Sequence, residues 1–228
     1  MAAADPKPLG PRSASAVLAS GGRAQVAAAE GGAPIRTLED QLHDAGLNPL
    51  GPCGRLSDYG DELLRTAPML QDLTAAEANI LGSSMLLVRA EPGQVLIREG
   101  DFGDWMMVLL KGTVDVTKRV AARNEAVTAD SNGQQDPPGE VAASRLAVLQ
   151  RGAAVGDMSM LDSEPRYASC TAIEAVEAGV LGRHAIALLI RDHPAVGAKL
   201  LVKITQLMAQ RLRNTSNQLV KLIAGRQS

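Results

Sequence analysis

Residues 155–170 read VGDMSMLDSEPRYASC, and this stretch decides the interpretation of the chain. Gly156 lets the backbone turn tightly, and residues 157–159 follow as a helix start whose first N–H groups have no partner within the helix. A helix start of this kind attracts anions. Pro165 ends the helical segment, and Arg166 then places a guanidinium fork at the start of an apolar strand. The stretch therefore predicts a pocket that holds one small phosphate from two sides.

These residues resemble the phosphate-binding cassette of cyclic nucleotide-binding domains, a family that includes bacterial catabolite-activator regulators and kinase regulatory subunits. The resemblance continues upstream through glycine-marked turns at Glu91–Gln94, Gly100–Asp104 and Lys111–Val116. It covers residues 73–192 of the chain. It implies a mainly β fold with flanking helices, an antiparallel β jelly-roll barrel with N-terminal helices and a long C-terminal helix.

The resemblance also assigns roles to individual residues. In the family, the acidic residue after the cassette glycine takes the ribose 2′-hydroxyl, which here is Asp157, and the arginine that pairs with the cyclic phosphate is Arg166. The ligand-binding set that it implies is Gly156, Asp157, Met158, Ser159, Arg166, Tyr167, Ala168 and Ser169. The implied ligand is a cyclic nucleotide, cAMP or cGMP, with no metal and no other cofactor.

Two positions depart from the family pattern. The family usually has Glu where Asp157 stands, and the shorter side chain draws the carboxylate back from the ribose. A small residue usually follows the arginine, whereas this chain has Tyr167. Its ring has three alternatives, which are to stack on a base, to fill part of the pocket, or to point away.

The pattern of short apolar runs agrees with an all-β centre. The predicted strands are 85–88, 95–97, 105–110, 114–118, 146–149, 167–173 and 172–181, most of them separated by glycine-bearing turns. Thr74 and Glu77 have capping-box spacing and predict a helix start before these strands. The predicted organisation is a disordered Ala/Gly/Pro-rich tail over 1–35, a helical segment over 36–72, the barrel over 73–192 with a flexible insertion at 121–143, and a C-terminal helix over 193–228.

The C-terminal helix carries one apolar stripe and a basic opposite face. Pro194 suits its first turn. The stripe consists of Leu201, Ile204, Met208, Leu212, Leu219 and Leu222. It has three interpretations, which are packing on its own barrel, a coiled-coil homodimer, and binding to a membrane or an acidic partner. Thr215 interrupts the seam, and the absence of Trp and Phe disfavours the membrane.

Composition limits the function classes. The chain has 228 residues, 46% of them hydrophobic and only 2% aromatic, which suits one aliphatic-cored domain with extensions. The net charge is −2, yet residues 195–228 carry six Lys and Arg and no Asp or Glu. Cys53 and Cys170 are too few for a disulfide framework or a zinc site, which favours a reducing cytoplasm. No apolar run reaches the roughly 18 residues of a membrane span.

Two further functions are disfavoured by the sequence. The 34 residues after Pro194 leave no room for a helix-turn-helix domain after a long helix, which argues against direct sequence-specific DNA binding. The three histidines, His43, His184 and His193, lie beside no nucleophile and have no metal-ligand spacing, so an enzyme is not expected.

The sequence therefore predicts a cytoplasmic, bacterial, stand-alone regulatory module that senses a cyclic nucleotide and acts through a protein partner or by dimerisation. One alternative is an interaction scaffold that keeps the barrel and binds no nucleotide. Another is a receptor for a different phosphorylated messenger, such as cyclic di-GMP, with Tyr167 stacked on a base.

Overall fold

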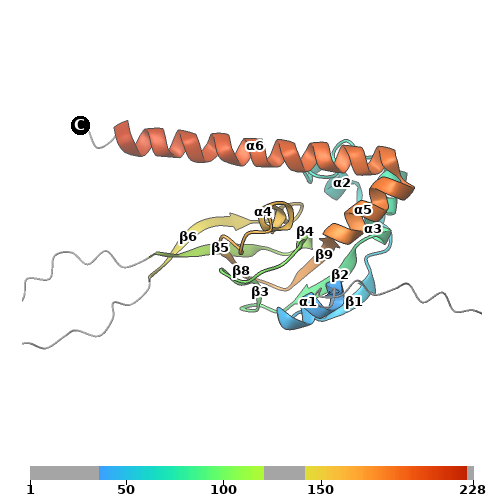
Figure 1. The fold of residues 1–228 in the computed structure, drawn as a ribbon, viewed down its shortest axis with the longest axis horizontal. Helices are drawn as coiled ribbons and strands as arrows, with labels where there is room; N and C mark the ends of the chain where they lie inside the picture. Colours follow the sequence, from blue (N-terminus) through green and yellow to red (C-terminus); the bar gives the residue numbers. More distant parts are fainter. Residues whose placement is uncertain (1–35, 121–141, 225–228) are drawn as a thin grey trace, which may run out of the picture. The chain divides into compact units, whose positions relative to one another are not determined.

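The computed structural model describes residues 36–120 and 142–224, and within them the strands form two antiparallel sheets (Figure 1). One sheet has the order β1-β2-β9-β4-β7, with β1 at Pro49–Pro52, β2 at Leu86–Ala90, β9 at Val176–Gly182, β4 at Trp105–Lys111 and β7 at Ala154–Val155. The other has the order β3-β8-β5-β6, with β3 at Val95–Ile97, β8 at Ser169–Ala172, β5 at Val114–Val120 and β6 at Ala142–Leu149. The chain thus crosses repeatedly between sheets, as in a jelly roll, which confirms the predicted fold class.

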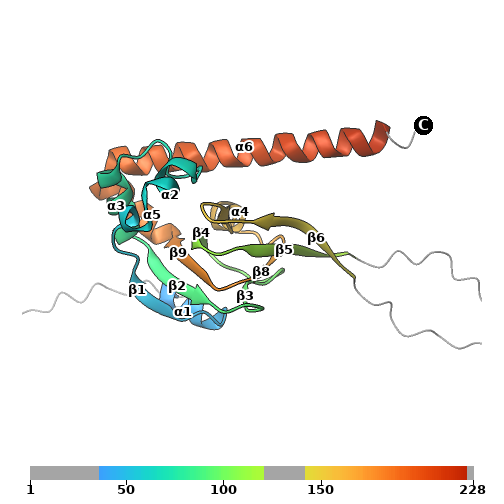
Figure 2. The same ribbon diagram turned by 180° about the vertical axis from the view of Figure 1, so that it is seen from behind.

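Helices flank the two sheets. They are α1 (Leu38–Asp44), the 3₁₀ helix η1 (Leu56–Tyr59), α2 (Asp61–Thr66), α3 (Ala75–Ser83), α4 (Asp157–Asp162), α5 (Arg183–Asp192) and α6 (Pro194–Ala224). The predicted capping box is confirmed, since Thr74 Oγ1 accepts from the Glu77 N–H while the Glu77 carboxylate accepts from the Thr74 N–H. In Figures 1 and 2, α6 passes over α4 and continues beyond it. Among the described residues, no helix has both the length and the apolarity to cross a bilayer.

Strand β4 explains how the core is divided. Met107 and Leu109 belong to the cluster between the two sheets, whereas Met106, Val108 and Leu110 pack in a second cluster with residues of α3, α5 and α6. Both faces of β4 are therefore buried, which is why its sequence is a continuous apolar run instead of an alternating one.

Three boundaries differ from the prediction. The helical segment predicted over 36–72 also contains β1, whose two prolines are tolerated because β1 is an edge strand paired only with β2. The strand predicted from Tyr167 begins at Ser169, because the preceding backbone pairs with the 100–101 turn instead of with a strand. The hairpin of β5 and β6 reaches Val120 and Ala142, so 142–143 belong to β6 and not to the insertion. The tail predicted over 1–35 and the rest of that insertion lie outside the described residues.

Apolar contacts and ion pairs attach α6 to the rest of the domain. Its buried residues are Val196, Gly197, Leu200 and Ile204. Lys199 pairs with Glu77 at the start of α3 at 2.8 Å, and Lys203 pairs with Asp72 at 2.5 Å. Much of the predicted basic face thus binds carboxylates of the same domain.

The predicted apolar stripe divides into two parts. Ile204 is buried and Met208 is half-buried against the domain. In contrast, Leu212, Leu219 and Leu222 are 69%, 57% and 69% exposed. Leu201, the first member of the stripe, is 38% exposed, so packing on its own barrel accounts only for Ile204 and part of Met208.

Replacing Glu77 with Gln tests the link between α3 and α6. Hydrogen bonds, first from Lys199 and then from Thr74, lower the pKa of Glu77 from its ordinary 4.5 to about 2. A carboxyl group with a lowered pKa stabilises the fold above its unfolded pKa, and this stabilisation disappears as the pH falls through its folded pKa. We expect the native protein to be more stable than Glu77→Gln at neutral pH, with the difference shrinking as the pH falls from 4.5 towards 2. Urea unfolding at several pH values measures it, and a pH-independent difference would contradict it.

Candidate functional site

Gly156 provides the turn between β7 and α4. The φ angle of Gly156 is 78°, a left-handed conformation that favours glycine, and Asp157 follows it as the first residue of α4. A Cβ at this position would lie 2.7 Å from Arg166 Nη1 and 3.1 Å from Ile97 Cδ1. Gly156 is therefore required for two reasons, the backbone conformation and the close approach of the arginine.

Arg166 is a buried cation, with 4% of its surface exposed. Its Nη1 donates to the Gly156 carbonyl and its Nη2 to the Trp105 carbonyl, both at 2.8 Å. Its guanidinium carbon lies 4.3 Å from the centre of the Trp105 ring. Burial lowers the pKa of Arg166 to about 10, which still leaves it charged at neutral pH. Within 36–120 and 142–224, no carboxylate forms an ion pair with it.

Asp157 is even more deeply buried, at 1% exposed. Its Oδ1 accepts from Arg211 Nη1 of α6 at 2.5 Å, while Arg211 Nη2 donates to the Ala154 carbonyl at 2.6 Å. The other carboxylate oxygen, Oδ2, is buried and has no hydrogen-bond partner in the described part of the chain. A buried acceptor without a donor is costly, so a hydrogen-bond donor at Oδ2 would stabilise this carboxylate.

Arg211 was not among the predicted site residues. It lies 54 positions from Asp157 in sequence, and it is one of six Lys and Arg residues among the last 34 residues of the chain. The segment contains no Asp or Glu, so any ion pair of its Lys and Arg residues must be with a carboxylate elsewhere in the domain. This was the signal in the sequence that could have indicated Arg211.

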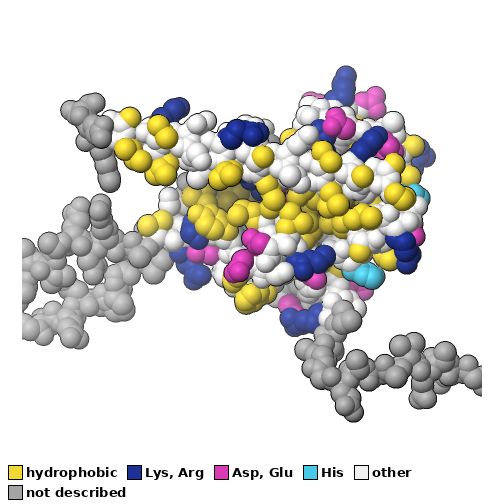
Figure 3. Space-filling view, turned by 45° about the horizontal axis from the view of Figure 1, so that its top comes forward, with side chains coloured by type: hydrophobic (Ala, Val, Ile, Leu, Met, Phe, Trp, Pro, Cys, Tyr) yellow, Lys and Arg dark blue, Asp and Glu magenta, His cyan; other side chains and the backbone are white. Residues whose placement is uncertain are grey.

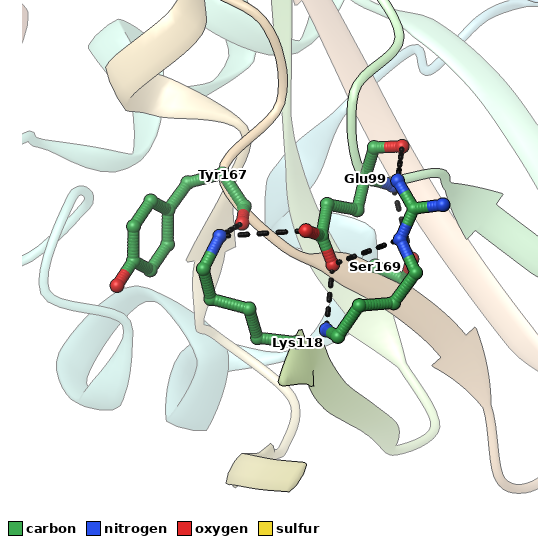
Figure 4. A network of polar contacts seen from close by, with 5 residues as sticks. Glu99, Lys118, Tyr167 and Ser169 are labelled. Carbon is green, nitrogen blue, oxygen red and sulfur yellow. Dashed lines mark hydrogen bonds and ion pairs between the residues drawn. The ribbon is translucent and has the colours of Figure 1, made fainter. Parts of the chain in front are cut away.

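Tyr167 takes part in a polar network outside the arginine pocket (Figure 4). Tyr167 is 56% exposed, and the centre of its ring lies 3.9 Å from Lys118 Nζ, which also donates to the Tyr167 carbonyl at 2.7 Å and to Glu99 at 3.4 Å. The Glu99 N–H donates to Ser169 Oγ at 3.0 Å. A hydrogen bond from the Arg119 N–H lowers the pKa of Glu99. The network holds the Tyr167 carbonyl and the Ser169 side chain, and the aromatic ring against Arg166 is that of Trp105.

The other predicted residues vary in exposure. Met158 is 43% exposed, Ser159 is 4% exposed, and both Ala168 and Ser169 are half-buried. Arg166 lines a cavity of about 350 Å³ together with Trp105 and Phe102. Ser159 lines a second cavity of about 230 Å³. Of the eight predicted residues, these two line the cavities, so the two cavities do not bring the predicted set together.

The site thus contains two complementary deficits. A buried guanidinium has no carboxylate partner among the described residues, and a buried carboxylate oxygen has no donor. A negatively charged group complements the first and a hydrogen-bond donor complements the second, and Asp157 lines neither of the two cavities. The described residues hold no group of three or more His, Cys, Asp or Glu side chains placed to bind a metal ion.

Comparison with known proteins identifies the domain. Residues 87–193 match the cyclic nucleotide-binding domain family. A CRP-like cAMP-activated global transcriptional regulator of Mycobacterium tuberculosis is 27% identical over 163 residues, which is 72% of this chain and 63% of that protein. A cAMP-dependent protein kinase regulatory subunit of Yarrowia lipolytica is 28% identical over 54% of this chain and 27% of its own length. The chain therefore spans less than two thirds of these relatives.

Solved structures agree with this result. A cyclic nucleotide-binding domain from Methylobacillus flagellatus has a TM-score of 0.61 at 28% identity, covering 76% of this chain and 88% of that one. The catabolite activator protein of Thermus thermophilus has a TM-score of 0.54 at 26% identity, covering 68% of this chain and 62% of that one. The match over residues 87–193 confirms the resemblance of the cassette to cyclic nucleotide-binding domains.

The two reasons for glycine at position 156 can be measured separately with Gly156→Ala and Gly93→Ala. Both residues have positive φ, but nothing lies within 4 Å of a Cβ at Gly93. Gly93→Ala should therefore lose only the left-handed backbone preference, about 1–2 kcal/mol. Gly156→Ala should be destabilised further, because its methyl group displaces Arg166. Urea unfolding gives both values, and equal losses would show that the arginine is not crowded.

Proposed function

We propose that this protein senses a cyclic nucleotide, cAMP or cGMP, and passes the signal to a protein partner or a second copy of itself. The observation that supports this is the pairing of deficits at Arg166 and Asp157 Oδ2. A cyclic nucleotide carries one phosphodiester charge and one ribose 2′-hydroxyl. The family to which the domain belongs and its regulatory relatives agree with a regulatory role and not a catalytic one. The proposed location is the bacterial cytoplasm.

In this mechanism the cassette binds the sugar and the phosphate together. Arg166 and the first N–H groups of α4 bind the phosphate, with Gly156, Ser159, Ala168 and Ser169 close by. The 2′-hydroxyl donates to Asp157 Oδ2. The site offers one buried cation beside a carboxylate, so a nucleoside monophosphate with nearly two negative charges would leave charge uncompensated.

Asp157 also connects the ligand to α6. Its Oδ1 binds Arg211 in the described structure, so the same carboxylate faces both the proposed ribose and the last helix. A hydrogen-bond donor at Oδ2 draws negative charge away from Oδ1, which weakens the ion pair between Asp157 and Arg211. The free energy needed to move α6 away from Asp157 changes accordingly. A ligand shifts the helix only as far as it binds one arrangement more tightly than the other.

Isothermal titration with cAMP, cGMP and cyclic di-GMP tests the proposal. We expect one cyclic mononucleotide to bind, and Arg166→Ala to weaken it by about 100-fold through loss of a charged hydrogen-bond partner. The exposed Arg213→Ala is the matched control and should bind normally. The 2′-deoxy analogue should bind about tenfold more weakly, and 5′-AMP should bind far more weakly than cAMP.

Other results would support the alternatives. No heat with any of the three at millimolar concentration would favour a ligand-free scaffold. Binding of cyclic di-GMP alone would favour a different messenger and a stacking role for Tyr167. Equal binding of the parent and 2′-deoxy nucleotides would remove the role given to Asp157.

We further propose that the exposed part of α6 contacts a second copy of the chain. Positions 201, 205, 208, 212, 215, 219 and 222 alternate in steps of four and three, which is the spacing of a coiled-coil seam. The flanking positions 209, 216 and 218 are uncharged Ala, Ser and Gln. Arg211 at a fourth flanking position already pairs with Asp157. Two parallel copies would therefore bring no unpaired like charges together at these positions.

Light scattering on Leu212→Ser/Leu219→Ser measures this contact. Both leucines are exposed, so the fold should survive while the molar mass falls from that of a dimer to that of a monomer. Val220→Ser is the matched control, since Val220 is 64% exposed but lies off the seam. A dimer that persists in the double variant, or dissociates in the control, would contradict the assignment.

A further inference from the structure

Trp105 makes an unusual set of contacts with the phosphate arginine. It is the only tryptophan in the chain and is 3% exposed. Its ring faces the guanidinium carbon of Arg166 at 4.3 Å, and its own carbonyl accepts from Arg166 Nη2 at 2.8 Å. One residue thus contacts the same guanidinium through its side chain and its backbone.

The backbone of Trp105 is firmly anchored. It is the first residue of β4 and pairs with Gly182 of β9, inside the five-stranded sheet. The cassette glycine directly follows β7, the strand that pairs with β4 in the same sheet. Arg166 therefore joins the start of β4, through Trp105, to the turn that leads from β7 into α4, through Gly156.

Two glycines leave space for this guanidinium. A Cβ at Gly103 would lie 2.7 Å from Arg166 Nη2 and 3.0 Å from Trp105 Nε1, and a Cβ at Gly156 would lie 2.7 Å from Nη1. The guanidinium is thus enclosed by the indole ring, the 103 turn and the cassette turn. Its position is set by the protein's own contacts.

We propose that Trp105 is a positioning residue, which fixes the plane and location of the Arg166 guanidinium before a phosphate arrives. The binding of a phosphate by Arg166 rests on the proposed function, whereas the contact between Trp105 and Arg166 is independent of it. An arginine side chain has several rotamers, and ordering it during binding would cost affinity. The ring also stabilises a buried cation that has no carboxylate partner in the described residues, because the face of an aromatic ring is electron-rich.

Trp105→Leu and Trp105→Phe separate the ring from its bulk. In the ligand-free protein, the Arg166 Nε–H resonance in nitrogen-15 NMR should carry an upfield ring-current shift and exchange slowly with water. Trp105→Leu should abolish the upfield shift and accelerate the exchange. Trp105→Phe should keep most of the shift, and its Nε–H should still exchange slowly. Gly103→Ala retains the tryptophan, but its Cβ would press on both Arg166 Nη2 and Trp105 Nε1, so it should also move the resonance.

The affinity for the cyclic nucleotide found by titration should follow the same order. We expect Trp105→Leu to bind about tenfold more weakly, corresponding to one desolvated cation–π contact, and Trp105→Phe to remain within about threefold of the native protein. Equal losses in Phe and Leu, or an unchanged Arg166 resonance in Leu, would overturn the proposal. If the native protein binds no nucleotide, the proposed function fails, and the resonance alone still decides whether Trp105 holds Arg166.

Discussion

The burial of one positive charge constrains much of this domain. Arg166 is 4% exposed, and in the described residues its partners are two backbone carbonyls and an indole ring instead of a carboxylate. Carbonyl dipoles and an aromatic face only partly replace the hydration that a guanidinium loses, which is why burial lowers its pKa. Keeping the charge in place requires glycine on two sides of it, at 103 and 156.

The same site also determines how the last helix is attached. Asp157 begins α4 and is nearly fully buried, so its charge needs a cation, and Arg211 of α6 supplies one. Lys199 and Lys203 attach earlier turns of the helix to carboxylates at Glu77 and Asp72. A helix without acidic residues is thus bound along one side by the acidic body of the domain. Beyond Arg211 the helix makes few contacts with its own domain, and its apolar side chains are exposed.

Much of this architecture follows from local patterns. The capping box at Thr74, the helix start at Pro194 and the glycine turn before Asp157 depend on a few consecutive residues, so they can be predicted from sequence. The edge strand Pro49–Pro52 could not, because its prolines argue against a strand until its place at the edge of a sheet is known. Arg211 and Trp105 also escaped prediction, since their partners lie 54 and 61 positions away.

The sequence by itself determined the class of fold and the cassette with its Gly156, Asp157 and Arg166, because glycine, proline and charge act over one or two turns of chain. Only the tertiary structure decided which side chains complete the site. It brought an indole from β4 against Arg166 and an arginine from α6 against Asp157, and it left one carboxylate oxygen without a donor. The physical reason is that burial makes each uncompensated charge costly. The partner that compensates it is therefore chosen by proximity in the folded molecule, which the linear order of residues does not record.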